Sequence, residues 1–201
     1  MGVIRTENFS SVEITTEHDL WVWLSNNFGL KDSVWLITYK KSTPQKYLSR
    51  EQILDALIAY GWIDGIRRKL DDQRTMQLIS QRKTQSWSAT YKQRAERLEA
   101  EGRMQKSGRD AISQSKLLGL WDAMQDVDTL VFPNDLQILL DKDRTAATYF
   151  TDCPPSYKRN VLRWLKSAKT ERTRQKRLDS IFTECKAENR YRKCNNWCEQ
   201  T

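Results

Sequence analysis

Apolar side chains recur at helical spacing near the start of the chain. Leu20, Trp23, Leu24 and Phe28 stand at positions i, i+3, i+4 and i+8, so they share one face of a helix. The pattern predicts a helix over 17–28.

A strand and a second helix follow. Residues 33–40 are rich in branched and aromatic side chains and end at a loop, which is typical of a buried strand. Ser49 and Gln52 have the spacing of a capping box, in which each side chain bonds the backbone of the other. They predict a helix over 50–60.

The pattern changes from helical to alternating at Gly61. A glycine at this place is typical of a helix end with positive φ. Residues 62–70 alternate, with Asp64 and Arg68 on the same side, and 74–82 alternate again after a turn at 71–73. With the strand at 33–40, this predicts a small antiparallel sheet of about three strands.

The remainder of the chain has helical patterns. Serines before a run that ends at Gly102 predict a helix through Glu101, and prolines predict two further helix starts. The expected helices are one that Ser86 or Ser88 caps and that runs through Glu101, one over 108–118, two that begin at Pro133 and Pro154, and one over about 171–188. The fold class is therefore α+β, a mainly helical single domain. We expect a flexible N-terminus over 1–16, the domain over 17–188 and a flexible C-terminal tail over 189–201.

Composition narrows the class of protein. Of 201 residues, 38% are apolar and 30% charged, which is enough apolar material for a core. The first residues lack the apolar stretch of a signal peptide, and no run of about 18 apolar residues occurs. The sequence predicts a cytoplasmic protein with no membrane span, and it does not indicate the oligomeric state.

Cysteine usage does not predict a metal site. Cys194 and Cys198 form a C-x-x-x-C pair near the end, but no second cysteine pair exists and His18, the one histidine, is distant in sequence. Reduced thiols are expected, with no metal and no cofactor.

Positive charge is concentrated in one part of the chain. The net charge is +8, and residues 156–193 hold thirteen of the 34 cations but four of the 26 acids. The rest of the chain is nearly neutral, so an anionic partner is expected at the basic helices.

Several short stretches together resemble the YdeI/OmpD-associated (OmdA, bacteriocin-protection) family over residues 17–185. They are Trp35-Leu in a strand that ends at Lys40, Gly61-Trp-Ile-Asp64-Gly65, Arg82-Lys83 with Ser86-Trp-Ser88, Glu101-Gly-Arg-Met104 with Gly108, and Ser167-Ala-Lys169 with Thr173-Arg174 and Arg177.

The resemblance implies a bacterial protein linked to protection against bacteriocins and cationic antimicrobial peptides, with no assigned reaction. Two positions depart from the family pattern. Gln81 stands where the family often has a proline, and Ala59 stands near the position of a family cysteine. A catalytic cysteine at that place is therefore excluded for this chain.

Asp64 is the candidate acid, base or counter-ion for Arg67, Arg68 or Arg82. The alternative is a structural salt bridge or a hydrogen bond at the start of a strand. Motifs of nucleotide binding, serine hydrolysis and metal catalysis are absent, so an enzyme that uses Asp64 is the least supported of three hypotheses.

Two cations and two hydroxyls precede the predicted helix that runs through Glu101: Arg82, Lys83, Ser86 and Ser88. They favour an anion site, because the dipole of a helix favours negative charge at its N-terminus. The alternative is a helix cap in which Trp87 is a hydrophobic staple. A non-enzymatic protein that binds an anionic small molecule or an acidic protein partner is the first hypothesis. Its predicted ligand-binding residues are Trp35, Trp62, Asp64, Arg82, Lys83, Ser86 and Trp87.

The last two helices supply the remaining hypothesis. Lys169, Arg174 and Arg177 can clamp an acidic group or phosphates through guanidinium contacts, and two consecutive basic helices can follow a nucleic-acid backbone. The alternative is a solvated basic face. No exposed aromatic platform is evident, so nucleic acid is not favoured.

Overall fold

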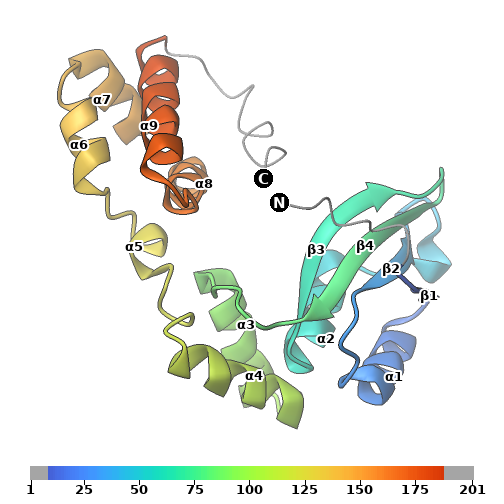
Figure 1. Ribbon diagram of the computed structural model, residues 1–201. Helices are drawn as coiled ribbons and strands as arrows, with labels where there is room; N and C mark the ends of the chain where they lie inside the picture. The colour runs from blue at the N-terminus through green and yellow to red at the C-terminus, as the bar shows by residue number, and fades with distance from the viewer. Residues whose placement is uncertain (1–8, 188–201) are drawn as a thin grey trace. The chain divides into compact units, whose positions relative to one another are not determined.

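The computed structural model describes residues 9–187. Contacts divide the chain into two compact units, one ending at Ala123 and one beginning at Met124, within the region expected to form one domain. The first unit contains the sheet, and the described part of the second is helical (Figure 1).

The predicted elements of the first unit are confirmed with small changes at their ends. Ser49 accepts a hydrogen bond from the backbone N–H of Gln52 at 3.2 Å, which confirms the capping box. The elements are β1 (Ser11–Glu13), α1 (Glu17–Asn27), β2 (Val34–Tyr39), η2 (Pro44–Lys46), α2 (Arg50–Ala59), β3 (Trp62–Lys69), β4 (Arg74–Gln81), α3 (Ala89–Ala100) and α4 (Lys106–Leu117).

The sheet has four strands in the order β1-β2-β4-β3 rather than the three predicted. Its β2, β4 and β3 strands are antiparallel as expected, but β1 pairs with β2 in parallel, with Ser11 opposite Trp35. The sheet is therefore mixed. The added strand lies in the segment 1–16 that was expected to be flexible, and its three residues are too few for an alternating pattern to reveal.

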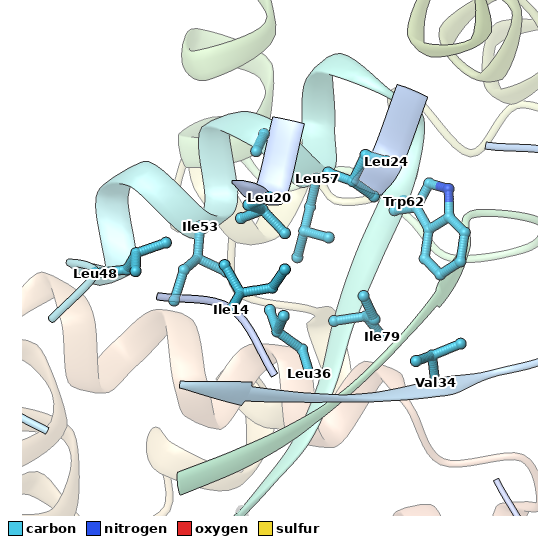
Figure 2. Packing of buried hydrophobic residues seen from close by; sticks show 11 residues of the cluster. Ile14, Leu20, Leu24, Val34, Leu36, Leu48, Ile53, Leu57, Trp62 and Ile79 are labelled. Atoms are coloured by element: carbon cyan, nitrogen blue, oxygen red, sulfur yellow. The ribbon is translucent and has the colours of Figure 1, made fainter. Parts of the chain in front are cut away.

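The helices α1 and α2 supply the apolar residues that cover one face of the sheet. Leu20 of α1, Leu57 of α2 and Leu36 of β2 are almost fully buried in one cluster, which also contains Trp62 and Ile79. Figure 2 shows these side chains directed toward one another between the helices and the strands. Burial of this apolar surface is the main stabilising contribution to the sheet layer.

A β-bulge interrupts β3 between Asp64 and Arg67. Asp64 lies opposite Ile79 and Arg67 lies opposite Gln77, so both share the helix-covered face, whereas Arg68 lies opposite Met76 on the other face. The prediction that Asp64 and Arg68 share a face is therefore wrong, because the extra residue at the bulge shifts the alternation by one.

The end of α2 brings several segments together. Gly61 has φ +74°, as predicted, and β3 begins immediately after it. The backbone N–H of Arg82 donates to the Gly61 carbonyl at 2.9 Å, and that of Gln105 donates to the Ala59 carbonyl at 3.1 Å. The end of β4 and the start of α4 are thus joined to the last residues of α2.

The second unit packs short helices around α9. Leu136, Phe150, Val161, Leu165 and Ile181 are among its buried core residues. The helices predicted from Pro133, from Pro154 and over 171–188 are confirmed, and two further helices were not predicted. The elements are α5 (Gln125–Asp128), α6 (Asn134–Leu140), α7 (Arg144–Asp152), α8 (Pro155–Lys166) and α9 (Glu171–Lys186).

We predict that Gly108→Ala destabilises the first unit. A Cβ on Gly108 would lie 2.2 Å from the Ala59 carbonyl oxygen and 2.7 Å from the Met104 sulfur, so α4 would have to move away from α2. The expected loss in free energy of unfolding is about 1–3 kcal/mol, despite the higher helix propensity of alanine. Urea unfolding measures it.

The matched control is Gly29→Ala, because no atom lies within 4 Å of the added Cβ. It should leave the free energy of unfolding unchanged or slightly raised. Equal effects of the two substitutions would contradict the close approach of α4 to α2.

Candidate functional site

Four side chains from three parts of the first unit form one network, which we call the Arg82 cluster. Its members are Asp64 of β3, Arg82 after β4, Trp87 before α3 and Tyr91 in the first turn of α3. The Tyr91 hydroxyl donates to Asp64 Oδ1, and the Arg82 guanidinium carbon lies 4.1 Å from the Trp87 ring centroid and 5.2 Å from that of Tyr91. The cluster therefore joins a cation, two aromatic rings and a carboxylate.

Arg82 is buried without a carboxylate in direct contact. Its relative exposure is 7%, and within residues 9–187 no carboxylate oxygen lies within 4.0 Å of its nitrogens. Nη1 donates to the carbonyls of Gln85 and Ser86 at 3.2 and 3.1 Å, whereas the buried Nε has no hydrogen-bond partner among the described residues. Burial lowers the pKa of Arg82 to about 10, so the guanidinium is still charged at neutral pH.

Asp64 interacts with neutral groups. Gln77 Nε2 donates to its Oδ2 at 3.1 Å, and the Tyr91 hydroxyl donates to Oδ1. Burial, followed by the hydrogen bond to Asp64, raises the pKa of Tyr91 well above its usual value. The phenol stays protonated and separates the carboxylate from Arg82. The predicted counter-ion role of Asp64 is therefore indirect, through Tyr91.

The other predicted ligand-binding residues lie around or away from the Arg82 cluster. Ser86 contributes its backbone carbonyl, and Lys83 is exposed beside Arg82. Trp62 is buried in the sheet core, where its ring centroid is 5.7 Å from that of Trp23. Trp35 lies on the opposite face of the sheet from Asp64, with Arg68 5.5 Å from its ring centroid.

Tyr91 is the member of the cluster that the sequence pattern did not reveal. It stands in the first turn of α3, where a tyrosine is read as a core residue of the helix stripe. Its partner Asp64 is 27 residues away, so no local sequence pattern links the two side chains.

The predicted basic residues of the second unit hold its helices together. Arg174 forms a two-point contact with Asp135, with Nε–Oδ2 and Nη2–Oδ1 distances of 2.5 and 2.9 Å. Arg177 donates to the Trp164 carbonyl and to Ser167 Oγ. Lys169 is exposed between α8 and α9. Two of the three predicted clamp residues are thus engaged within the unit.

The described cysteines do not offer a nucleophile. Cys153 and Cys185 are buried and free, and burial raises the pKa of both thiols, that of Cys185 to about 12. They are therefore protonated at neutral pH. The predicted pair Cys194 and Cys198 lies outside the described residues.

Residues 9–187 contain no group of three histidine, cysteine or acidic side chains placed to hold a metal ion. Among the helices described, none combines the length and apolar character that a membrane crossing requires.

Family models match two separate parts of the chain. Residues 129–188 match the family described as "Bacteriocin-protection, YdeI or OmpD-Associated". Residues 12–111 match a family described as a domain of unknown function. No curated protein and no solved structure matches the chain.

The first of these matches confirms the predicted resemblance to the YdeI/OmpD-associated family for residues 129–188. The earlier part of the predicted span, including the Arg82 cluster, is matched by the other family. The division between the two matches falls close to the division between the two compact units at Ala123 and Met124.

We predict that Tyr91→Phe destabilises the first unit by about 1–3 kcal/mol, because a partly buried carboxylate loses a hydrogen bond. Urea unfolding of Tyr91→Phe, Asp64→Asn and the double variant measures the coupling between the two side chains. A coupling energy of at least about 0.5 kcal/mol is expected. Strict additivity would contradict the direct contact.

We predict that Asp135 makes the second unit sensitive to acid. The hydrogen bond from Arg174 is the largest of the effects that lower the Asp135 pKa below 3.8. The contribution of the Asp135–Arg174 pair to the free energy of unfolding is therefore fully present above pH 3.8. It is lost as the pH falls through the lower folded-state pKa of Asp135. Because both side chains are partly exposed, the contribution should be about 1 kcal/mol or less.

The measurement compares acid unfolding of the wild type with that of Asp135→Asn, followed by a probe in the second unit. The difference in stability should be largest near neutral pH and should vanish in strong acid. A difference that persists unchanged in strong acid would mean that the ion pair is not its source.

Proposed function

We propose that this protein is a non-enzymatic binding protein that recognises an anionic group, on a small molecule or on an acidic partner, at the Arg82 cluster. The observation that carries the proposal is the state of Arg82. Within residues 9–187, this buried guanidinium has no carboxylate in contact and its Nε has no hydrogen-bond partner, so it has donor capacity and positive charge that an anion would satisfy.

The start of α3 supports the same proposal. The Ser88 side chain makes no capping hydrogen bond, and the first turn of α3 contains no acidic residue. The partial positive charge of the helix N-terminus is therefore not offset locally by a carboxylate. Arg82 lies over Trp87 and Tyr91, which stand on either side of Ser88 in sequence, so cation and dipole act on the same region.

Lys83 adds an exposed cation next to the buried one. Its backbone N–H is held by Gln85 Oε1 at 2.8 Å, which fixes the loop between β4 and α3. An anion approaching from solvent would meet Lys83 before it reaches Arg82. This order suits phosphate or carboxylate groups, which accept hydrogen bonds from both side chains.

The two alternative functions have weaker support. An enzyme that uses Asp64 would need a partner nucleophile or acid, and within the described residues Asp64 contacts Gln77 and Tyr91. A nucleic-acid module would need free cations on α8 and α9, but Arg174 and Arg177 bond groups within the second unit.

The protective role linked to the YdeI/OmpD-associated name would be indirect in this proposal. The chain carries a net charge of +8 and would repel cationic peptides, so direct capture of such peptides is electrostatically unfavourable. The cytoplasmic location stays a prediction of the sequence.

Phosphate and tripolyphosphate titrations, followed by thermal unfolding, test the proposal. The wild type should gain stability with increasing anion concentration, because a ligand that binds the folded state shifts the equilibrium. Arg82→Lys, which keeps the charge but loses the planar donors, and Lys83→Ala should each reduce this gain. Lys106→Ala, an exposed lysine on α4, is the matched control and should not change it.

An equal gain in the wild type and in both variants would refute anion binding at the Arg82 cluster. Absence of any gain at low ionic strength would do the same. Because Arg82→Lys retains a buried cation, its own stability without anion shows whether the fold is intact.

A further inference from the structure

A cavity of about 580 Å³ lies between α3 and α4 in the first unit. Both helices pack on α2, and the gap between their outer faces stays open because Ala95 and Ala100 of α3 are small. Ile112 of α4 and Trp121 supply the apolar lining. The volume is in the range of small-molecule sites, which is about 300–1,000 Å³.

Trp121 forms a fixed wall of the cavity. Its ring centroid lies 5.0 Å from that of buried Trp87, and the Lys92 and Lys116 ammonium groups lie 5.3 and 5.1 Å from it. Lys92 is paired with Asp122 at 2.9 Å. The indole is therefore held in place while still lining the cavity.

Within the described residues, the charges around the cavity comprise one ion pair and two groups that have no partner of opposite charge. Arg109 Nε and Glu99 bind each other at 2.9 Å, which links α3 to α4 near their connecting loop. Among residues 9–187, the side chains of Glu96 on α3 and Lys116 on α4 make no hydrogen bond or ion pair, and both are exposed. The cavity thus presents one carboxylate that has no cation partner, from α3, and one ammonium whose contact is the Trp121 ring, from α4.

We propose that this cavity binds a zwitterion of dipeptide size with an aromatic side chain. The apolar body would lie against Ile112 and Trp121, the carboxylate would meet Lys116, and the ammonium would meet Glu96. A ligand with one net charge would satisfy one of these groups and oppose the other, so charge complementarity selects a molecule that carries both charges. This site is separate from the Arg82 cluster and does not depend on anion binding there.

The test uses phenylalanyl-phenylalanine with the full-length protein. Titration is followed by the NMR signals of the Ile112 and Ser113 amides and of the Trp121 indole N–H, all at the cavity. The N-acetyl derivative removes the ammonium, and the C-terminal amide removes the carboxylate. Each change should weaken binding about two- to five-fold, as expected for loss of one exposed ion pair.

Two variants test whether Lys116 meets the ligand carboxylate and Glu96 meets the ligand ammonium. Lys116→Met should abolish the preference for the free dipeptide over its amide, and Glu96→Gln should abolish the preference over its N-acetyl derivative. Both positions are exposed, so the fold should be retained. Lys106→Met, on α4 outside the cavity, should leave both preferences unchanged.

Ser113→Trp is the steric test. It places a large side chain at the wall of the cavity from an exposed position and should weaken binding at least about ten-fold. The proposal is overturned if the cavity signals do not shift with the dipeptide at millimolar concentration. It is also overturned if the dipeptide and both derivatives bind equally, or if the charge variants leave the preferences intact.

Discussion

The close approach of backbone at the end of α2 is the constraint on which the first unit depends. Gly61 takes φ +74°, and a Cβ there would lie 2.8 Å from the Ser107 carbonyl oxygen and 2.9 Å from Ala111 Cβ. A glycine is thus required both for the turn and for contact with α4. The same short stretch accepts the backbone N–H groups of Arg82 and Gln105. One chain reversal therefore fixes the start of β3, the end of β4 and the position of α4.

This junction also explains how the candidate sites arise. The Arg82 backbone is held on Gly61, and its side chain contacts Trp87 before α3 and Tyr91 in the first turn of α3. Trp87 in turn lies against Trp121, which forms a wall of the cavity between α3 and α4. The Arg82 cluster and the cavity are therefore neighbouring consequences of one packing arrangement. The burial of Arg82 costs free energy that the aromatic faces and two carbonyls offset in part.

The elements that depend on neighbouring residues could be predicted from the sequence. The capping box at Ser49, the glycine at 61 and the alternation after it identified α2, β3 and β4 because each signal depends on adjacent residues. The three-residue β1 and the bulge near Gly65 were not predicted, since strand pairing determines both. Of the predicted ligand-binding residues, the structure brings Asp64, Arg82 and Trp87 into one network, in which Tyr91 links Asp64 to Arg82. Trp35 and Trp62 do not join them, because strand register places one on the other face and the other in the core.

Hydrogen exchange of the Arg82 and Gln105 backbone amides tests directly whether the end of β4 and the start of α4 are held at the Ala59 and Gly61 carbonyls. Both amides are bonded to carbonyls at the end of α2, so they should exchange as slowly as the amide of buried Ile79 and open with the same free energy. Exchange of either amide at the rate of an exposed loop would show that β4 or α4 is not held at this junction, and would contradict the account.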